Sequence, residues 1–205
     1  ESGRVRADLR STANLLADTT GPAIYVGYSL GGRVCLHLAL MSPHVVHRLA
    51  LLGATAGIVD DDDPASRRAA DERLAQHIVE VGVDAFLDEW VDQPLFAGLT
   101  LTDDDRADRA RNTAVGLASS LRLSGTGTQL PLWDRLRELN MPVLALAGEL
   151  DTKFVPVAER IAASVPQGVF AQIHGAGHAA HLQQPGQVAT RLEMWLRGGR
   201  LALAT

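Results

Sequence analysis

One serine of this chain lies in a sequence pattern that could make it a nucleophile. Gly27-Tyr28-Ser29-Leu30-Gly31 stands between residues 22–26, which predict a short buried strand, and residues 33–41, which predict a helix. Glycine is expected wherever the backbone of such a sharp turn is strained or crowded. The serine hydroxyl would then stand at the positive end of the helix. We therefore predict that Ser29 is a catalytic nucleophile, against the alternative of an ordinary serine in a glycine-rich turn.

A serine hydroxyl needs a base, and the base needs an acid that orients it. Asp151 follows the predicted strand 142–147, and His178 follows the predicted strand 169–173. The chain order Ser, Asp, His is the order found when such a triad is built on a parallel sheet. We predict Asp151 as the acid and His178 as the base, with Glu149 as the nearest substitute for the acid.

The histidines around residue 178 also suggest a metal site, because His174, His178 and His181 have spacings that superficially suit zinc. Gly175 and Gly177 oppose this interpretation, since they disfavour the helix that would place His174 and His178 on one face. We predict no metal and no cofactor.

The elements that must position these residues alternate between strand and helix. Strands are predicted at 22–27, 47–52, 142–147 and 169–173, and helices at 2–18, 30–42, 156–164 and 185–197. Residues 65–81, 83–90 and 102–123 predict helices with no strand between them, after the acidic loop 60–64. The pattern predicts an α/β-hydrolase fold with a mostly parallel sheet and a helical cap insertion. The expected core is 1–57 with 129–205, and the expected cap is 58–128.

The composition excludes several classes of function. The 205 residues carry a formal charge of −5, and no basic run or long apolar run suggests nucleic acid or a membrane. The single cysteine, Cys35, cannot form an internal disulfide, which favours a reducing compartment such as the cytoplasm. The composition does not predict an oligomeric state.

Several segments resemble a narrower group of α/β-hydrolases. They are Gly27 to Arg33, Glu89-Trp90 with Gln93-Pro94-Leu95-Phe96, Arg111-Asn112, Gly148 to Phe154, and Gly175 to His181. The chain resembles the MenH-type enzymes of menaquinone biosynthesis, the 2-succinyl-6-hydroxy-2,4-cyclohexadiene-1-carboxylate synthases. The resemblance implies a lyase that eliminates pyruvate from an enolpyruvyl cyclohexene with three carboxylates, with the serine–histidine pair removing a ring proton.

Such a trianionic substrate needs fixed cations, and guanidinium groups bind carboxylates through two parallel hydrogen bonds. Arg33 lies one helical turn after Ser29, and the resemblance implies carboxylate-binding roles for Arg67 and Arg111. The alternatives are solvated helix charges, with Arg68 as the rival of Arg67. The remaining expected substrate contacts are Tyr28 and Leu30 beside the serine, Trp90 and Phe96 as pocket walls or cap core, and Lys153, the only lysine.

The segment before Ser29 departs from the family pattern. The turn begins after only 26 residues, and no earlier strand and no His-Gly loop precede it. In this fold, such a loop supplies one N–H of the oxyanion hole, the other coming from the residue after the nucleophile, here Leu30. We expect an N-terminally truncated fold with an uncovered sheet edge, either a fragment of a longer protein or a degenerate protein.

Three functions therefore remain open from the sequence. The first is the MenH-like lyase, and the second is a serine hydrolase for an ester or a carbon–carbon bond. The third is a small-molecule binder, or an inactive fragment, that retains the triad without turnover.

Overall fold

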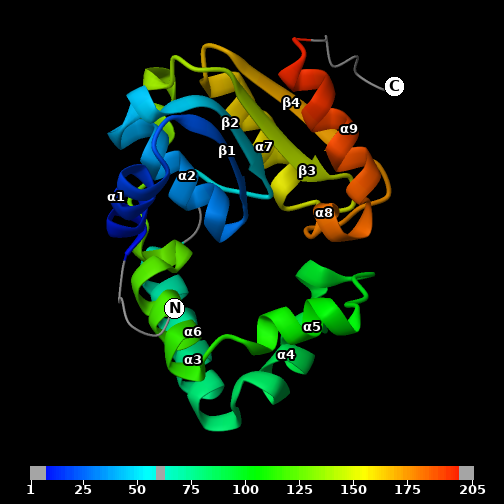
Figure 1. Ribbon diagram of the computed structural model, residues 1–205. Helices are drawn as coiled ribbons and strands as arrows, with labels where there is room; N and C mark the ends of the chain where they lie inside the picture. The colour runs from blue at the N-terminus through cyan, green and yellow to red at the C-terminus, as the bar shows by residue number, and fades with distance from the viewer. Residues whose placement is uncertain (1–7, 59–62, 199–205) are drawn as a thin grey trace. The chain divides into compact units, whose positions relative to one another are not determined.

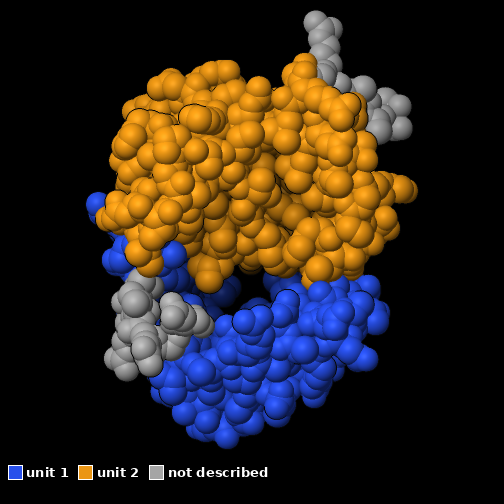
Figure 2. Space-filling model, viewed as in Figure 1, with its two compact units in different colours: residues 1–12, 57–131 blue, residues 13–56, 132–205 orange. Residues whose placement is uncertain are grey.

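The computed structural model describes residues 8–58 and 63–198. The chain clusters into two compact units (Figure 2). Unit 1 is residues 1–12 and 57–131, and unit 2 is residues 13–56 and 132–205. The expected core of 1–57 with 129–205 remains a proposal, and the observed clustering differs from it at residues 1–12, 57 and 129–131.

Unit 2 contains a parallel sheet of four strands in the order β1-β2-β3-β4 (Figure 1). The strands are β1 (Ala23–Tyr28), β2 (Val46–Leu52), β3 (Val143–Gly148) and β4 (Gly168–Ile173). All three pairings are parallel, with Tyr25 opposite Leu49, Leu51 opposite Ala145 and Leu146 opposite Ala171. The parallel order brings the carboxyl ends of the strands, and the loops that follow them, to one edge of the sheet. The parallel sheet predicted from the sequence is confirmed.

Helices cover both faces of this sheet. Leu49 and Leu51 of β2 pack in a cluster with residues of α2 (Leu30–Met41) and α7 (Phe154–Ser164). Ala50 and Leu52 point to the other face and pack in a cluster with residues of α8 (Ala180–Gln183) and α9 (Pro185–Leu196). Successive side chains of a strand point to opposite faces, so a strand buried on both sides is apolar throughout. This explains the continuous apolar sequence of β3 and of residues 49–52 in β2.

Strand β1 lies at the edge of the sheet and pairs with β2 alone within the part of the chain that the structure describes. Its Ile24 and Val26 side chains are 45% and 58% exposed. An apolar edge strand with unpaired backbone groups favours pairing with another strand. The uncovered edge expected from the sequence is therefore present in the described chain.

Unit 1 is helical over its described residues. Its longer helices are α3 (Pro64–Val81), α4 (Val83–Val91), α5 (Asp103–Ala110) and α6 (Ala114–Ser124). Asp63 accepts hydrogen bonds from the N–H groups of Ala65 and Ser66 and so begins α3 at Pro64. Most of the acidic loop expected at 60–64 lies outside the described residues.

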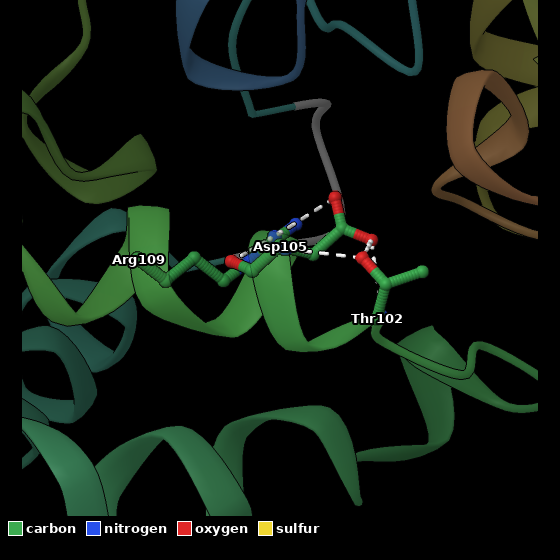
Figure 3. Close-up of polar contacts among 3 residues, drawn as sticks. All are labelled: Thr102, Asp105 and Arg109. Carbon is green, nitrogen blue, oxygen red and sulfur yellow. Dashed lines mark hydrogen bonds and ion pairs between the residues drawn. The ribbon is translucent and has the colours of Figure 1, made fainter.

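The single helix expected at 102–123 is wrong, because two helices occupy this segment. Helix α5 ends at Ala110, and Thr113 starts α6 by accepting a hydrogen bond from the Gly116 N–H group. At the start of α5, Thr102 and Asp105 cap each other reciprocally, and Arg109 donates to the carbonyl oxygen of Asp105 (Figure 3). Threonine side chains that bond the backbone favour helix starts over helix interiors, which explains the break.

The remaining elements complete the chain. They are α1 (Leu9–Thr20) and the short 3-10 helices η1 (Pro43–Val45), η2 (Pro94–Phe96), η3 (Thr126–Thr128) and η4 (Trp133–Glu138). Of the first helix, expected at 2–18, residues 2–7 lie outside the described residues.

Candidate active site

Ser29 stands at a strained turn between β1 and α2. Its φ is +47°, and it is the one non-glycine residue with a positive φ among the described residues. Its N–H group donates to the Leu52 carbonyl oxygen at 2.9 Å, and its own carbonyl oxygen accepts from Arg33 N–H at 3.1 Å. These bonds hold a conformation that costs on the order of 1–3 kcal/mol for a residue with a Cβ. The turn therefore fixes the serine side chain in place outside the strand.

The glycines around Ser29 do not all serve the turn in the same way. A Cβ at Gly27 would lie 2.6 Å from backbone atoms of Gly31 and Gly32, and a Cβ at Gly32 would lie 2.5 Å from the Ala54 Cβ. A Cβ at Gly31 would meet no atom within 4 Å. The close packing of the turn therefore requires Gly27 and Gly32, and the expectation of crowding does not hold at Gly31.

Three predicted residues meet in one chain of hydrogen bonds. His178 Nε2 lies 3.3 Å from Ser29 Oγ, and His178 Nδ1 lies 2.7 Å from Asp151 Oδ2. The Asp151 and His178 side chains are almost fully buried, with 3% and 2% of their surface exposed. The second carboxylate oxygen of Asp151 accepts from the Phe154 N–H group at 3.3 Å. This is the arrangement in which a carboxylate orients an imidazole toward a serine hydroxyl.

Glu149, the alternative acid, has different partners. Its carboxylate accepts the Gly175 N–H group at 2.9 Å and lies 2.7 Å from His174 Nδ1. The Glu149 N–H donates to Ile173, and the Leu150 N–H donates to Ala176. The loops after β3 and β4, which carry Asp151 and His178, are thus joined side by side.

Other residues pack directly around His178. The ring centroids of Phe154 and Tyr28 lie 4.6 Å and 5.3 Å from the imidazole, and Tyr28 also packs 4.3 Å from the His181 ring. Gly53, just after β2, has a φ of +56°, and a Cβ there would lie 2.9 Å from His178 Cε1. Sequence reasoning missed Gly53. Its position directly after a predicted strand was the only available signal.

The remaining predicted residues of unit 2 lie near the ends of helices. Leu30 opens α2, where a backbone N–H group has no acceptor within the helix and can face a ligand. Arg33 lies one turn further along α2 and is partly exposed. Lys153 precedes α7, is exposed, and its Nζ lies 5.9 Å from the Phe154 ring centroid.

The predicted arginines of the cap belong to unit 1. Arg67 Nε donates to Asp71 Oδ1 at 2.9 Å, whereas its rival Arg68 donates to the Gly127 carbonyl oxygen at 2.9 Å. Arg111 is 82% exposed along its side chain and lies 3.3 Å from an oxygen of Asp108. Arg68 therefore joins α3 to η3, while the side chains of Arg67 and Arg111 contact carboxylates of their own helical turn.

The predicted aromatic residues of unit 1 pack on one another. The Trp90 ring lies 5.4 Å from that of Phe86 and 5.6 Å from that of Phe96. Phe86 is buried, while Trp90 and Phe96 are partly exposed. This contact is typical of the packed core of a small helical unit, and both rings remain partly exposed.

The described residues contain neither a cluster of metal ligands nor a membrane-spanning helix. No group of three or more His, Cys, Asp or Glu side chains in residues 8–58 and 63–198 is arranged to hold a metal ion. None of the helices in the same ranges is both long and apolar enough to cross a membrane.

Residues 2–191 match the model of the alpha/beta hydrolase family. The chain belongs to this family. It is 35% identical to the putative 2-succinyl-6-hydroxy-2,4-cyclohexadiene-1-carboxylate synthase of Bacillus subtilis over 78% of this chain. It is 33% identical to the 2-succinyl-6-hydroxy-2,4-cyclohexadiene-1-carboxylate synthase of Salmonella newport over 84% of this chain. The resemblance to MenH-type members drawn from the sequence is confirmed.

Solved structures agree with this assignment. The structure of MenH from S. aureus superposes with a TM-score of 0.83 at 30% identity, covering 92% of this chain and 74% of that one. A thermophilic esterase from Thermogutta terrifontis has the same fold, with a TM-score of 0.79 at 23% identity over 94% of this chain and 73% of that one. The chain spans 60% of the B. subtilis relative and 67% of the Salmonella relative.

Proposed function

We propose that this protein is a MenH-like lyase that eliminates pyruvate from 2-succinyl-5-enolpyruvyl-6-hydroxy-3-cyclohexene-1-carboxylate in menaquinone biosynthesis. The observation that carries the proposal is the joint similarity to two synthases of this name and to the MenH structure. The hydrogen-bonded set Ser29, His178 and Asp151 supports it, because proton removal by an activated serine needs this geometry. The cytoplasmic location expected from the single cysteine is part of the same proposal.

The proposed reaction begins with a proton transfer at Ser29. The Asp151 carboxylate accepts the Nδ1–H of His178, which leaves Nε2 as the basic nitrogen. His178 draws the proton from the Ser29 hydroxyl while the serine oxygen removes a proton from the substrate ring. The C–H electron pair forms a double bond between ring carbons 2 and 3, the existing double bond between carbons 3 and 4 shifts to carbons 4 and 5, and the bond from carbon 5 to the enolpyruvyl oxygen breaks. Enolpyruvate leaves and becomes pyruvate, so no water is consumed.

The substrate-binding part of the proposal rests on cationic and apolar side chains. Arg33 in unit 2 and Arg67 and Arg111 in unit 1 are proposed to bind the three carboxylates, since guanidinium matches a carboxylate with two donors. Leu30 N–H is proposed to stabilise developing negative charge. The apolar faces are assigned to Tyr28, Trp90 and Phe96, and Lys153 is proposed as a further cation.

The test follows pyruvate release from the enolpyruvyl substrate. Ser29→Ala is expected to lower kcat by about 10³-fold or more, because serine and histidine act as one unit. Ser120→Ala, at an exposed serine of α6, is the control and is expected to match the wild type. Serine-independent release would contradict the proposal. Faster turnover of simple aryl esters, with no loss in Arg33→Ala, would favour an ester hydrolase.

A further inference from the structure

Asp71 of α3 is a buried carboxylate, which is unusual for an aspartate on a helix. Only 4% of the residue is exposed. Its Oδ1 accepts the Arg67 Nε–H at 2.9 Å, and its Oδ2 has no hydrogen-bond partner among the described residues. Burying a carboxylate oxygen without a partner costs free energy. A leucine or alanine would fill the same position on α3 without this cost.

The end of α6 encloses this carboxylate. Helix α6 packs on α3, and Gly125 follows its last residue. A Cβ at Gly125 would collide with Asp71 Oδ2 and would lie 2.5 Å from the Leu121 carbonyl oxygen. The glycine therefore permits the close approach of the two helices that keeps water from the carboxylate. Within unit 1, the cation that contacts the Asp71 carboxylate is Arg67.

Arg67 uses only one edge of its guanidinium in this contact. The bond to Asp71 involves Nε, and no further side-chain hydrogen bond of Arg67 is found in the described chain. Its side chain is 43% exposed. By contrast, Arg122 uses both Nε and a terminal nitrogen on Glu72, at 2.7 and 2.8 Å. Arg67 thus presents its two terminal nitrogens, which form the edge that can grip a carboxylate with parallel hydrogen bonds.

We propose that Asp71 is a positioning residue that holds Arg67 by Nε, so that the terminal nitrogens face a carboxylate of the substrate. This inference rests on the proposed function, since it gives Arg67 the carboxylate-binding role assigned there. A buried hydrogen-bond acceptor orders the long Arg67 side chain already in the free protein. Substrate binding then no longer bears the entropy cost of fixing the rotamers of this side chain. Asp71 thereby completes the ordering of Arg67 before the substrate arrives.

The first test is a double-mutant cycle on pyruvate release. Asp71→Asn keeps the shape of the side chain and removes its charge, and it is expected to raise KM about tenfold with kcat changed less than about twofold. In an Arg67→Ala background the same substitution is expected to change KM by less than about twofold. An equal effect of Asp71→Asn in both backgrounds, or no effect in either, would overturn the inference.

Two further variants separate positioning from general loss of structure. Glu72→Gln weakens the neighbouring surface contact between α3 and α6 and is expected to leave KM unchanged. Asp71→Ala replaces Asp71→Asn if the latter does not fold, and the same rise in KM is expected. A KM change in Glu72→Gln as large as that in Asp71→Asn would point to a merely structural role.

A second readout separates this inference from the proposed function. Propane-1,2,3-tricarboxylate is titrated into the ¹⁵N-labelled protein while the Arg67 Nε–H signal is followed by NMR. If Asp71→Asn binds the tricarboxylate about fivefold or more weakly than the wild type, the inference is supported. If the wild type also releases no pyruvate, only the proposed function fails. Equal binding by the wild type and Asp71→Asn overturns the inference whatever the activity.

Discussion

The imidazole of His178 depends on a glycine far from it in the sequence. Gly53 has a positive φ of +56°, and its Cα faces the imidazole so closely that a Cβ would lie 2.9 Å from Cε1 and 3.1 Å from Nδ1. Nδ1 is the atom that contacts Asp151, and Cε1 is bonded to it. The absence of a side chain at residue 53 therefore allows the bond between histidine and carboxylate to form.

Gly53→Ala is expected to lower kcat by about 10²-fold, because a small displacement of a catalytic group costs on that order. The matched control is Gly31→Ala, where a Cβ meets open space inside α2. Alanine is the better helix former, so Gly31→Ala should keep its activity and gain about 0.5–1 kcal/mol of stability. Pyruvate release gives kcat for both variants, and thermal melting gives their stability. Equal activity in the two would show that Gly53 does not constrain His178.

At the scale of elements, two loops after adjacent strands carry the acid and the base. Strands β3 and β4 pair in register up to Gly148 and Ile173, so their loops start together. Glu149 then bonds the Gly175 N–H group and lies against His174. Glu149, which the sequence suggested as a substitute for the acid, therefore joins the two loops.

Glu149→Ala removes both contacts and is expected to lower kcat about tenfold and stability by about 1 kcal/mol. Glu149→Gln retains an acceptor for the Gly175 N–H group and should stay within about twofold of the wild type. His174→Ala, at a side chain that is 84% exposed, is the control for loss of the contact with His174 alone. The measurements are kcat and the urea midpoint. Full activity in Glu149→Ala would contradict a joining role.

At the scale of the whole molecule, the apolar core of unit 2 contains the single cysteine. Cys35 lies in the cluster between α2 and the sheet and is 5% exposed. Burial raises the pKa of the Cys35 thiol from 9.0 to about 11, because the thiolate is poorly solvated there. The native state therefore keeps the thiol neutral at a pH where the unfolded chain ionises it.

This shift makes stability depend on pH in the alkaline range. Because the folded-state pKa is the higher one, the contribution is complete below about pH 9 and is lost as the pH rises toward 11. The free energy of unfolding should fall by roughly 2 kcal/mol more in the wild type than in Cys35→Ala between pH 8 and 11. Urea unfolding at several pH values measures the difference. Parallel pH profiles for the two proteins would show that the thiol is not shielded.

The sequence alone determined the features that depend on local pattern. The four strands, the turn at Ser29 and the order Ser29, Asp151, His178 follow from apolar periodicity and glycine placement within short windows. The break between α5 and α6 was missed, although Thr113 had the side chain of a helix start. Helix α5 consists of Asp, Arg and Ala only, so it has no apolar period of its own that would mark its end, and the capping bond of Thr113 starts α6.

Only the tertiary structure decided which side chains meet. Ser29 and His178 are 149 positions apart, so no local pattern distinguishes their contact from others. The fold brought Asp151 rather than Glu149 to His178, and it gave Arg68 a backbone partner while leaving Arg67 on Asp71. It also placed Gly53 against the imidazole. These choices depend on the packing of strands and helices far apart in the chain, which residue type and spacing do not specify.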